Sequence, residues 1–295
     1  MTFIAHLING ISLGSVYAII ALGYTMVYGI AKMLNFAHGD VIMVGAYVSF
    51  FGYTSLGVNP IVAILLAMLT CTILGVVIEK LAYKPLRSAA SLAVLITAIG
   101  MSYFLQNAAQ ILWTPTPRSY PSLIKFDALN IKLFDGELTI SSETVITILS
   151  CVVIMALLVF ITQKTKIGKS MRAVSEDKGA AQLMGINVNA TISVTFAIGS
   201  ALAAIAGVLL CSFSPVLEPT TGSLPGIKAF TAAVFGGIGS IPGAFFGGVL
   251  LGIIEKMSQA YISTEIADAI VFSVLIIVLL IKPTGLLGKK QHEKV

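Results

Sequence analysis

Charged residues are scarce in this sequence of 295 residues, where they make up 11% of the chain. A typical soluble domain has about 25%, so this composition excludes one. Hydrophobic residues make up 57% and the mean hydropathy is +0.98, which indicates several membrane-spanning segments. A transmembrane barrel is also excluded, because runs such as residues 61–78 show no alternation of polar and apolar residues. The sequence therefore predicts an all-α membrane protein.

Cysteine and histidine are also rare, with three of each. Cys71, Cys151 and Cys211 all lie in apolar runs, where a small buried side chain is the commoner role. No histidine or cysteine motif has metal-ligand spacing. Short glycine motifs around Ser12 and Gly168 partly match a hydrolase elbow and a phosphate-binding loop, but neither follows a strand. We therefore predict no metal site, no cofactor and no catalytic residues.

Long uncharged runs are what the sequence has instead, and a membrane helix needs about 20 such residues. The runs cover 7–31, 41–58, 60–78, 88–117, 144–163, 190–217, 229–254 and, more weakly, 266–281. No basic region precedes the first run, so we expect it to remain as a membrane segment rather than a cleaved signal. The prediction is a polytopic protein with about eight transmembrane segments, forming a single domain over 1–295.

Most of the 18 basic residues fall in three clusters, which the positive-inside rule places in the cytoplasm together with the C-terminus. The clusters are Lys80, Lys84 and Arg87; Lys164, Lys166, Lys169, Arg172 and Lys178; and Lys282, Lys289, Lys290 and Lys294. The 118–143 loop is predicted to lie outside, because acidic residues (Asp127, Asp135, Glu137 and Glu143) outnumber its basic ones. Topology accounts for the net charge of +5, so no nucleic acid partner is predicted.

The second half of the chain contains an odd number of runs where an even number is needed. Three apolar runs follow residue 190, after the basic cluster that is predicted to be cytoplasmic. Three crossings would end outside the cell, yet the C-terminal basic cluster is also predicted to be cytoplasmic. The 226–260 segment is the one we expect to be broken, into two half-helices or a re-entrant pair. Its interrupting residues are Gly236, Gly237, Gly239, Pro242 and Gly243.

The first half has a similar interruption at 34–40. Asn35, His38 and Asp40 lie there between two apolar runs, and Gly39 allows the backbone to turn. Discontinuous helices in both halves of a transporter point to its translocation pathway. We predict that this pathway is lined by Asn35, His38, Gly39, Asp40, Gly236, Gly237, Gly239, Pro242 and Gly243. The alternative, that 34–40 is a short loop at the membrane surface, stays open.

The 164–190 segment is the longest charged stretch between apolar runs. Met171, Val174, Ala181, Leu183, Met184 and Ile186 are its apolar residues, and Gly185 with Asn187 provides a helix stop. A helix at the membrane surface is therefore predicted. It is either an ordinary connector or the docking element for a partner.

Three blocks resemble one known family. SMRAVSEDKGAAQLMGINV resembles the cytoplasmic EAA-type coupling loop of ABC importer permeases, specifically the branched-chain amino acid permeases of the LivH type. NGISLGSVYAIIALGYTMVYGIAKMLNFAHGDVIMVGAY is similar to the N-terminal signature of that family. AVFGGIGSIPGAFFGGVLLGIIE is similar to its C-terminal glycine-rich element. The resemblance extends from residue 5 to about 287 and keeps the order of the family.

The resemblance implies a permease subunit in a bacterial cytoplasmic (inner) membrane, with no ATPase activity of its own. Apart from membrane lipid, the implied partners are a second homologous (LivM-like) permease, two ABC ATPase subunits (LivG/LivF-like) and an extracytoplasmic amino-acid-binding protein. The implied coupling residues are Met171, Arg172, Glu176, Asp177, Ala180, Ala181 and Gly185. Glu176 and Asp177 would make polar contacts with the ATPase, and the two alanines and Gly185 would pack into its groove. Lys178-Gly179 departs from the family pattern and predicts a kink in this helix.

Other functions remain as alternatives. Similar permeases carry urea or short amides, and a secondary transporter driven by an ion gradient belongs to a different class. Such a carrier would place acidic residues within its membrane helices. Here the acids lie near the ends of the runs, which favours the ABC permease: Asp40, Glu79, Glu143, Glu218, Glu255, Glu265 and Asp268.

Overall fold

The computed structural model describes residues 2–87, 89–123, 129–133 and 136–288. It is 79% helical, and six helices are long and apolar enough to cross a membrane. This confirms the predicted all-α polytopic class. The predicted total of about eight transmembrane segments is not confirmed, because the other apolar helices are shorter than 18 residues.

The six long helices are α1 (Thr2–Ala31), α3 (Pro60–Ile78), α4 (Ser91–Trp113), α5 (Ser142–Lys164), α8 (Val188–Phe213) and α10 (Ile241–Tyr261). A π-helical turn (Glu79–Tyr83) and a 3-10 turn (Lys84–Leu86) extend α3. The shorter helices are α2 (His38–Thr54), α6 (Lys166–Glu176), α7 (Lys178–Leu183), α9 (Ser223–Gly236) and α11 (Ala267–Ile281). Two antiparallel strand pairs join β1 (Arg118–Ser119) to β4 (Val216–Leu217) and β2 (Leu129–Leu133) to β3 (Gly136–Ile140).

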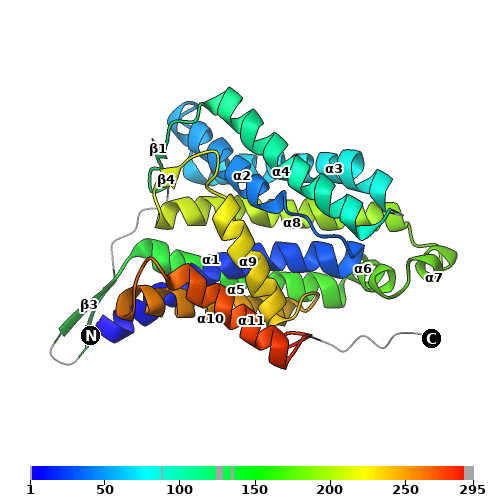
Figure 1. The fold of residues 1–295 in the computed structure, drawn as a ribbon. Coiled ribbons are helices and arrows are strands. Elements are labelled where there is room, and N and C mark those ends of the chain that lie inside the picture. The colour runs from blue at the N-terminus through cyan, green and yellow to red at the C-terminus, as the bar shows by residue number, and fades with distance from the viewer. Residues whose placement is uncertain (1, 88, 124–128, 134–135, 289–295) are drawn as a thin grey trace.

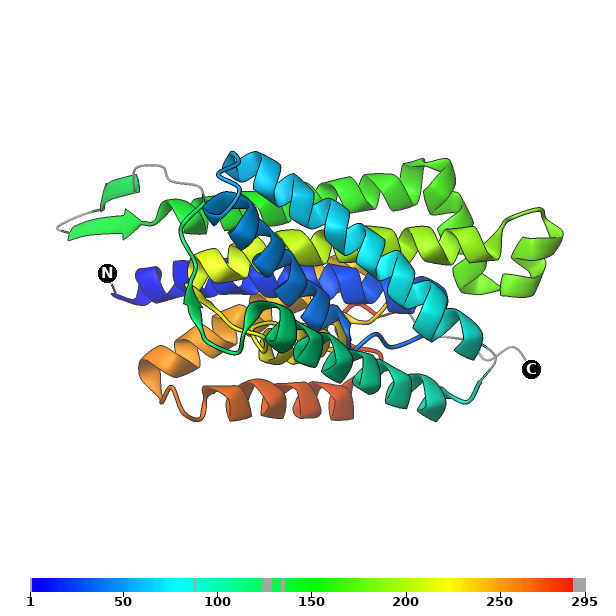
Figure 2. The same ribbon diagram turned by 90° about the horizontal axis from the view of Figure 1, so that it is seen from above.

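The helices run between two ends of the molecule (Figures 1 and 2). We call the end with α6 and α7 the coupling end, and the end with the strands the strand end. Arg87 donates a hydrogen bond to Asn189, and Lys178 donates one to the Ala31 carbonyl, so two of the predicted cytoplasmic clusters meet at the coupling end. In the third cluster Lys282 follows α11, and Lys289, Lys290 and Lys294 lie outside the described residues.

The loop that was predicted to be external lies at the opposite end from these basic clusters. Its strands β1 to β3 lie at the strand end, as does the start of α1 (Figure 1). Asp127 and Asp135 lie outside the described residues. The separation of basic and acidic loops agrees with the expectation from the positive-inside rule.

The predicted break in the 226–260 segment is confirmed. α9 ends at Gly236 and α10 begins at Ile241, and between them Gly237 (φ +110°) and Gly239 (φ +92°) adopt conformations that favour glycine. Four helices, α8 to α11, therefore follow the charged segment, and this even number removes the conflict. α10 has 21 residues and is no half-helix, whereas the 14 residues of α9 span only about 21 Å of a core roughly 30 Å thick.

α1 is the central helix, and its closest neighbour is α10. Val16, Ile19 and Leu22 are completely buried. Glycine allows the two backbones to touch: a Cβ atom added to Gly252 would lie 2.2 Å from the Cα of Gly14. The glycines at four-residue spacing in α10 thus form a close-packed interface, as is common between membrane helices.

Gly252→Val is expected to destabilise the protein by roughly 3 kcal/mol or more, because the added side chain meets backbone atoms that cannot rotate away. For a chain of this size that corresponds to a melting temperature lower by about 6 °C. Thermal unfolding of the purified protein measures the change. Gly100→Val is the matched control, since a Cβ atom at Gly100 on α4 has no neighbour within 4 Å. Equal melting temperatures for the two variants would contradict the close α1–α10 contact.

Candidate functional site

The charged 164–190 segment folds into two short helices rather than one. Thr165 caps α6, its Oγ1 accepting a hydrogen bond from Gly168 N (3.1 Å). Asp177 is extended (φ −155°, ψ 114°) and caps α7, its Oδ1 accepting from Gly179 N (2.8 Å) and Ala180 N (3.0 Å). The expected single helix from Met171 to Gly185, kinked at Lys178-Gly179, is therefore wrong. The break lies at Asp177, because its side chain satisfies the first N–H groups of a new helix.

Three apolar residues anchor this segment to the bundle. Met171, Val174 and Ala181 are at most 3% exposed. Their burial holds α6 and α7 against the rest of the chain. Met171 is consequently not available to a partner in this conformation, whereas Ala180 is exposed and Ala181 lines a groove.

Two large apolar residues protrude from the same segment. Leu183 is 90% exposed and Met184 is 82% exposed, and Gly185 (φ +82°) then turns the chain back toward α8. Both residues were predicted as apolar residues of this segment but not as coupling residues. The signal was a pair of large apolar residues at the exposed end of a charged helix.

A groove of about 580 Å³ runs between α6 and α7. Glu176, Asp177 and Ala180, all predicted coupling residues, line it together with Met184. Arg172 is also exposed, and its guanidinium donates to the carbonyl of Thr162 in α5. The coupling end thus presents an apolar projection beside a groove lined by both apolar and charged residues, which is a geometry suited to a protein partner.

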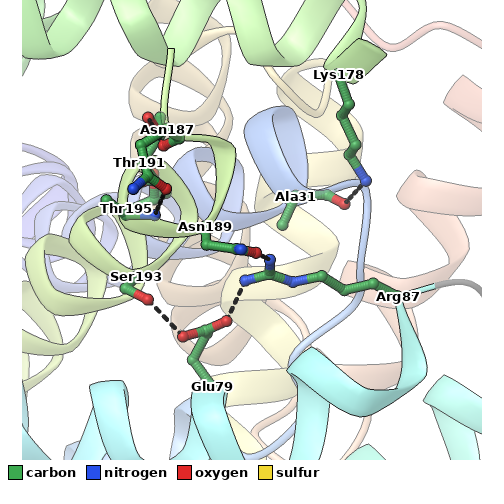
Figure 3. Close-up of polar contacts among 10 residues, drawn as sticks. Ala31, Glu79, Arg87, Lys178, Asn187, Asn189, Thr191, Ser193 and Thr195 are labelled. Carbon is green, nitrogen blue, oxygen red and sulfur yellow. Dashed lines mark hydrogen bonds and ion pairs between the residues drawn. The ribbon is translucent and has the colours of Figure 1, made fainter. Parts of the chain in front are cut away.

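Polar contacts connect α7 and the start of α8 to the membrane helices (Figure 3). Lys178 Nζ donates to the Ala31 carbonyl (3.2 Å) at the C-terminus of α1, where a positive charge is favourable. Partial burial, with the positive charges of Arg87 and Lys32, lowers the pKa of Lys178 below its ordinary value. A displacement of α7 would therefore act directly on the end of α1.

A second connection runs from α8 to the end of α3 (Figure 3). Arg87 donates to Asn189 near the start of α8 and to Glu79 in the π-helical turn. Glu79 is fully buried, and its Oε2 accepts from Ser193 Oγ (2.6 Å). A buried carboxylate of this kind is tolerated because it is paired with a cation and a hydroxyl.

The predicted pathway residues before α2 lie inside the bundle. Asn35 is 4% exposed, and His38 and Asp40 are each 1% exposed. The open alternative of a surface loop is therefore wrong. Asn35 Oδ1 accepts from Tyr83 OH (2.9 Å), and the His38 ring packs edge-on to Tyr24 with 4.7 Å between centroids.

Asp40 belongs to a polar cluster that joins three helices. Its Oδ1 accepts from Gln106 Nε2 of α4 (2.9 Å), and the same nitrogen donates to Ser223 Oγ at the start of α9 (3.1 Å). The starts of α2 and α9 touch: a Cβ atom on Gly222 would lie 1.8 Å from the carbonyl oxygen of Gly39. Two helix N-termini therefore converge near a buried carboxylate, an arrangement found around transported solutes and ions.

The predicted glycine break lies elsewhere. Gly236 packs against Gly243, and Gly239 lies beside Gly29 near the end of α1. Gly237 contacts Gly288, and Pro242 is exposed in the first turn of α10. The structure thus brings together Asn35, His38, Gly39 and Asp40, and places Gly236, Gly237, Gly239, Pro242 and Gly243 at the other end of α9. The residues that lie near Asp40 instead of this glycine break were not predicted: Gln106, Gly222 and Ser223.

A third polar cluster links α1, α9, α10 and α11. Lys228 Nζ lies 2.8 Å from Glu255 Oε1 and 2.6 Å from Asp268 Oδ1, and Tyr17 OH donates to Glu255 Oε2 (2.9 Å). Glu255 is only 3% exposed. The expectation that the acids lie near the ends of apolar runs therefore gives no argument against ion coupling, since Asp40, Glu79 and Glu255 are all buried.

Comparisons with known proteins identify the family that this chain resembles. The family described as "Branched-chain amino acid transport system / permease component" matches residues 6–279. The chain is 45% identical to the high-affinity branched-chain amino acid transport system permease protein LivH of Salmonella typhimurium, covering 99% of this chain and 98% of that one. It is 43% identical to BraD of Pseudomonas aeruginosa, a permease protein of the same description, with the same coverage. Among solved structures, PsaBC from Streptococcus pneumoniae in complex with Fab matches 94% of this chain and 91% of that chain at 15% identity, with a TM-score of 0.49.

Proposed function

This chain belongs to the family of branched-chain amino acid transport permease components, and we propose that it is the permease subunit of an ABC importer for leucine, isoleucine and valine. The identity to LivH over nearly the full length is the observation that supports this most directly. ATP hydrolysis would occur on partner subunits, so the chain itself would not be an enzyme. It would lie in the cytoplasmic membrane with the coupling end and the C-terminus in the cytoplasm.

The coupling end would dock an ABC ATPase subunit. Leu183 and Met184 project from the bundle, and the neighbouring groove offers Glu176 and Ala180 to a partner. The remaining partners would be a second, homologous permease, a second ATPase subunit and an extracytoplasmic amino-acid-binding protein. That protein would approach the strand end, which faces away from α6 and α7 (Figure 1).

Movement of the ATPase would reach the pathway through the anchored contacts of this segment. Lys178 binds the last carbonyl of α1, and residues 32–37, which lead into α2, follow directly. Asp40 in the first turn of α2 then meets α4 and α9 through Gln106. A displacement of α7 would thereby change the junction at which the two broken segments touch. This is a rigid-body switch of the kind used for alternating access.

Uptake of labelled leucine at submicromolar concentration tests the proposal in cells with and without the gene. We expect uptake to disappear on deletion and to return with the plasmid-borne gene. Excess unlabelled isoleucine should compete, whereas urea and ribose should not. Uptake should stop on depletion of cellular ATP and continue when ion gradients are collapsed at constant ATP. Unchanged leucine uptake after deletion would contradict the substrate, and loss with the ion gradient alone would contradict the ABC mechanism.

A further inference from the structure

A cavity of about 300 Å³ opens at the strand end, away from the coupling surface, and its lining residues Thr221 and Pro225 flank the start of α9. It lies between α1, α8 and α10 and the segment that leads from β4 into α9. Its size is at the lower limit of small-molecule sites, which suits a solute of a few heavy atoms. Its walls combine aliphatic and aromatic side chains with two kinds of charge.

The apolar wall comes from two helices. Leu13 of α1 and Leu210 and Phe213 of α8 line the cavity. Leu13 and Leu210 are each 6% exposed, so they form a fixed surface rather than mobile side chains. A branched aliphatic side chain of a ligand would be removed from water here, and each buried methylene contributes roughly 0.8 kcal/mol.

The charged wall holds a cation and an anion that do not neutralise each other. Lys256 Nζ donates to Gln259 Oε1 (3.0 Å) and lies 5.2 Å from the centre of the Phe213 ring. An ammonium group has three N–H donors, so this contact with Gln259 uses one of them. Glu218 Oε1 accepts from Thr220 Oγ1 (2.8 Å). Both charged side chains are described by the structure, and they form no ion pair with each other.

The other acid of this cavity is already occupied. Glu255 accepts hydrogen bonds from Lys228 and Gln259 through Oε1 and from Tyr17 through Oε2. It therefore serves the helix contacts, which leaves Glu218 as the second carboxylate that lines the cavity.

We propose that this cavity is a binding site for the zwitterionic amino acid as it enters the permease. Lys256 would bind the α-carboxylate, Glu218 the α-ammonium group, and Leu13, Leu210 and Phe213 the aliphatic side chain. The inference rests on the proposed function and adds to it the place at which the substrate is first held. A solute with only one of the two charges would leave the other charge of the site without a partner, and this gives selectivity for amino acids over amides or urea.

Thiol protection tests the site separately from transport. Ser214 lies in the cavity wall and is exposed, and its replacement by cysteine changes a single atom. The three native cysteines are buried, so Ser214→Cys should be the position that a membrane-impermeant thiol reagent labels. Millimolar leucine is expected to slow the labelling of the purified complex at least fivefold, which corresponds to occupancy of about 80% of the site, reached at roughly four times the dissociation constant. Thr264→Cys, exposed in the turn after α10, is the control that leucine should not protect.

Two charge variants test the assigned roles in the same background. Lys256→Gln and Glu218→Gln should each raise the leucine concentration that gives half-maximal protection by roughly tenfold, the cost of losing one charged hydrogen bond. Lys80→Gln at the coupling end and Glu265→Gln at the strand end, both exposed, should leave it unchanged. If the wild-type complex imports leucine and Ser214→Cys is not protected, the binding site is refuted and the function stands. If urea or acetamide protects as well as leucine does, the zwitterion assignment is refuted. If the complex imports no leucine at all, the proposed function itself fails.

Discussion

Leu183→Asp is expected to reduce leucine uptake to background while the permease still folds and reaches the membrane. The side chain is 90% exposed at the end of α7, so its replacement removes no contact within the chain. A large apolar residue at the centre of a protein interface typically contributes about 2–4 kcal/mol, which corresponds to a loss of affinity of roughly 30-fold or more. A buried carboxylate without a partner adds a further cost. The measurement is co-purification of the ATPase subunits with a tagged permease, together with uptake.

Leu56→Asp is the matched control for this prediction. Leu56 is 70% exposed in the turn after α2, far from α7, and the substitution introduces the same charge. This variant should retain its ATPase subunits. Met184→Asp is expected to act like Leu183→Asp, because Met184 is 82% exposed beside the groove. Normal co-purification and normal uptake with Leu183→Asp would exclude this projection as the docking element.

The all-α polytopic class could be predicted because two strong physical constraints act on a membrane protein. Long apolar runs are needed to cross the bilayer, and basic residues collect on one side. Both are local features of the sequence. The clusters around Arg87 and Lys178 accordingly meet at the coupling end. Even the break at Gly236 to Gly239 could be inferred from the parity of the runs and was found where expected.

The charged 164–190 segment was expected to be helical and it is, but its internal geometry was not predicted. A kink was predicted at Lys178-Gly179, because glycine weakens a helix, whereas the structure has a break at Asp177. Ser, Thr, Asn and Asp compete with helical hydrogen bonds through their side chains, so an aspartate before a glycine was itself a capping signal. Which apolar residues face the bundle also depends on this break. Ala181 became an anchor, and Leu183 was left exposed.

The predicted pathway residues have partners that the sequence alone could not reveal. Asn35, His38 and Asp40 could be selected because polar residues between two membrane helices are unusual. Their hydrogen-bond partners could not be selected in this way, because they are distant in the sequence. Gln106 is 66 residues from Asp40, and Ser223 is 117 residues from Gln106. A glutamine in an apolar helix carries no information about which neighbour it contacts. The pairing of the two broken segments was therefore assigned to the wrong end of α9.

The buried ion pair between Lys228 and Glu255 is expected to have the largest effect on stability. Removing one partner of a buried pair typically costs about 3–5 kcal/mol, because the other charge remains without compensation. Glu255→Ala leaves Lys228, which is 5% exposed, with only the partly exposed Asp268. It also removes the acceptor of the Tyr17 hydroxyl. At roughly 2 °C per kcal/mol for a chain of this size, the melting temperature should fall by about 6–10 °C.

A double-variant cycle separates loss of the pair from loss of packing. Lys228→Met alone should be destabilising, because Glu255 then depends on Tyr17 and Gln259 for its hydrogen bonds. Lys228→Met with Glu255→Gln removes both charges and keeps side chains of similar volume, so it should be more stable than the sum of the effects of Lys228→Met alone and Glu255→Gln alone predicts. A coupling energy of about 1–3 kcal/mol would establish that the two charges act together. Purely additive changes in melting temperature would show that each residue stabilises the bundle independently. Because this pair holds α9 against α10, and α9 begins beside Asp40, a loss of stability here should also disturb the junction of the two broken helices.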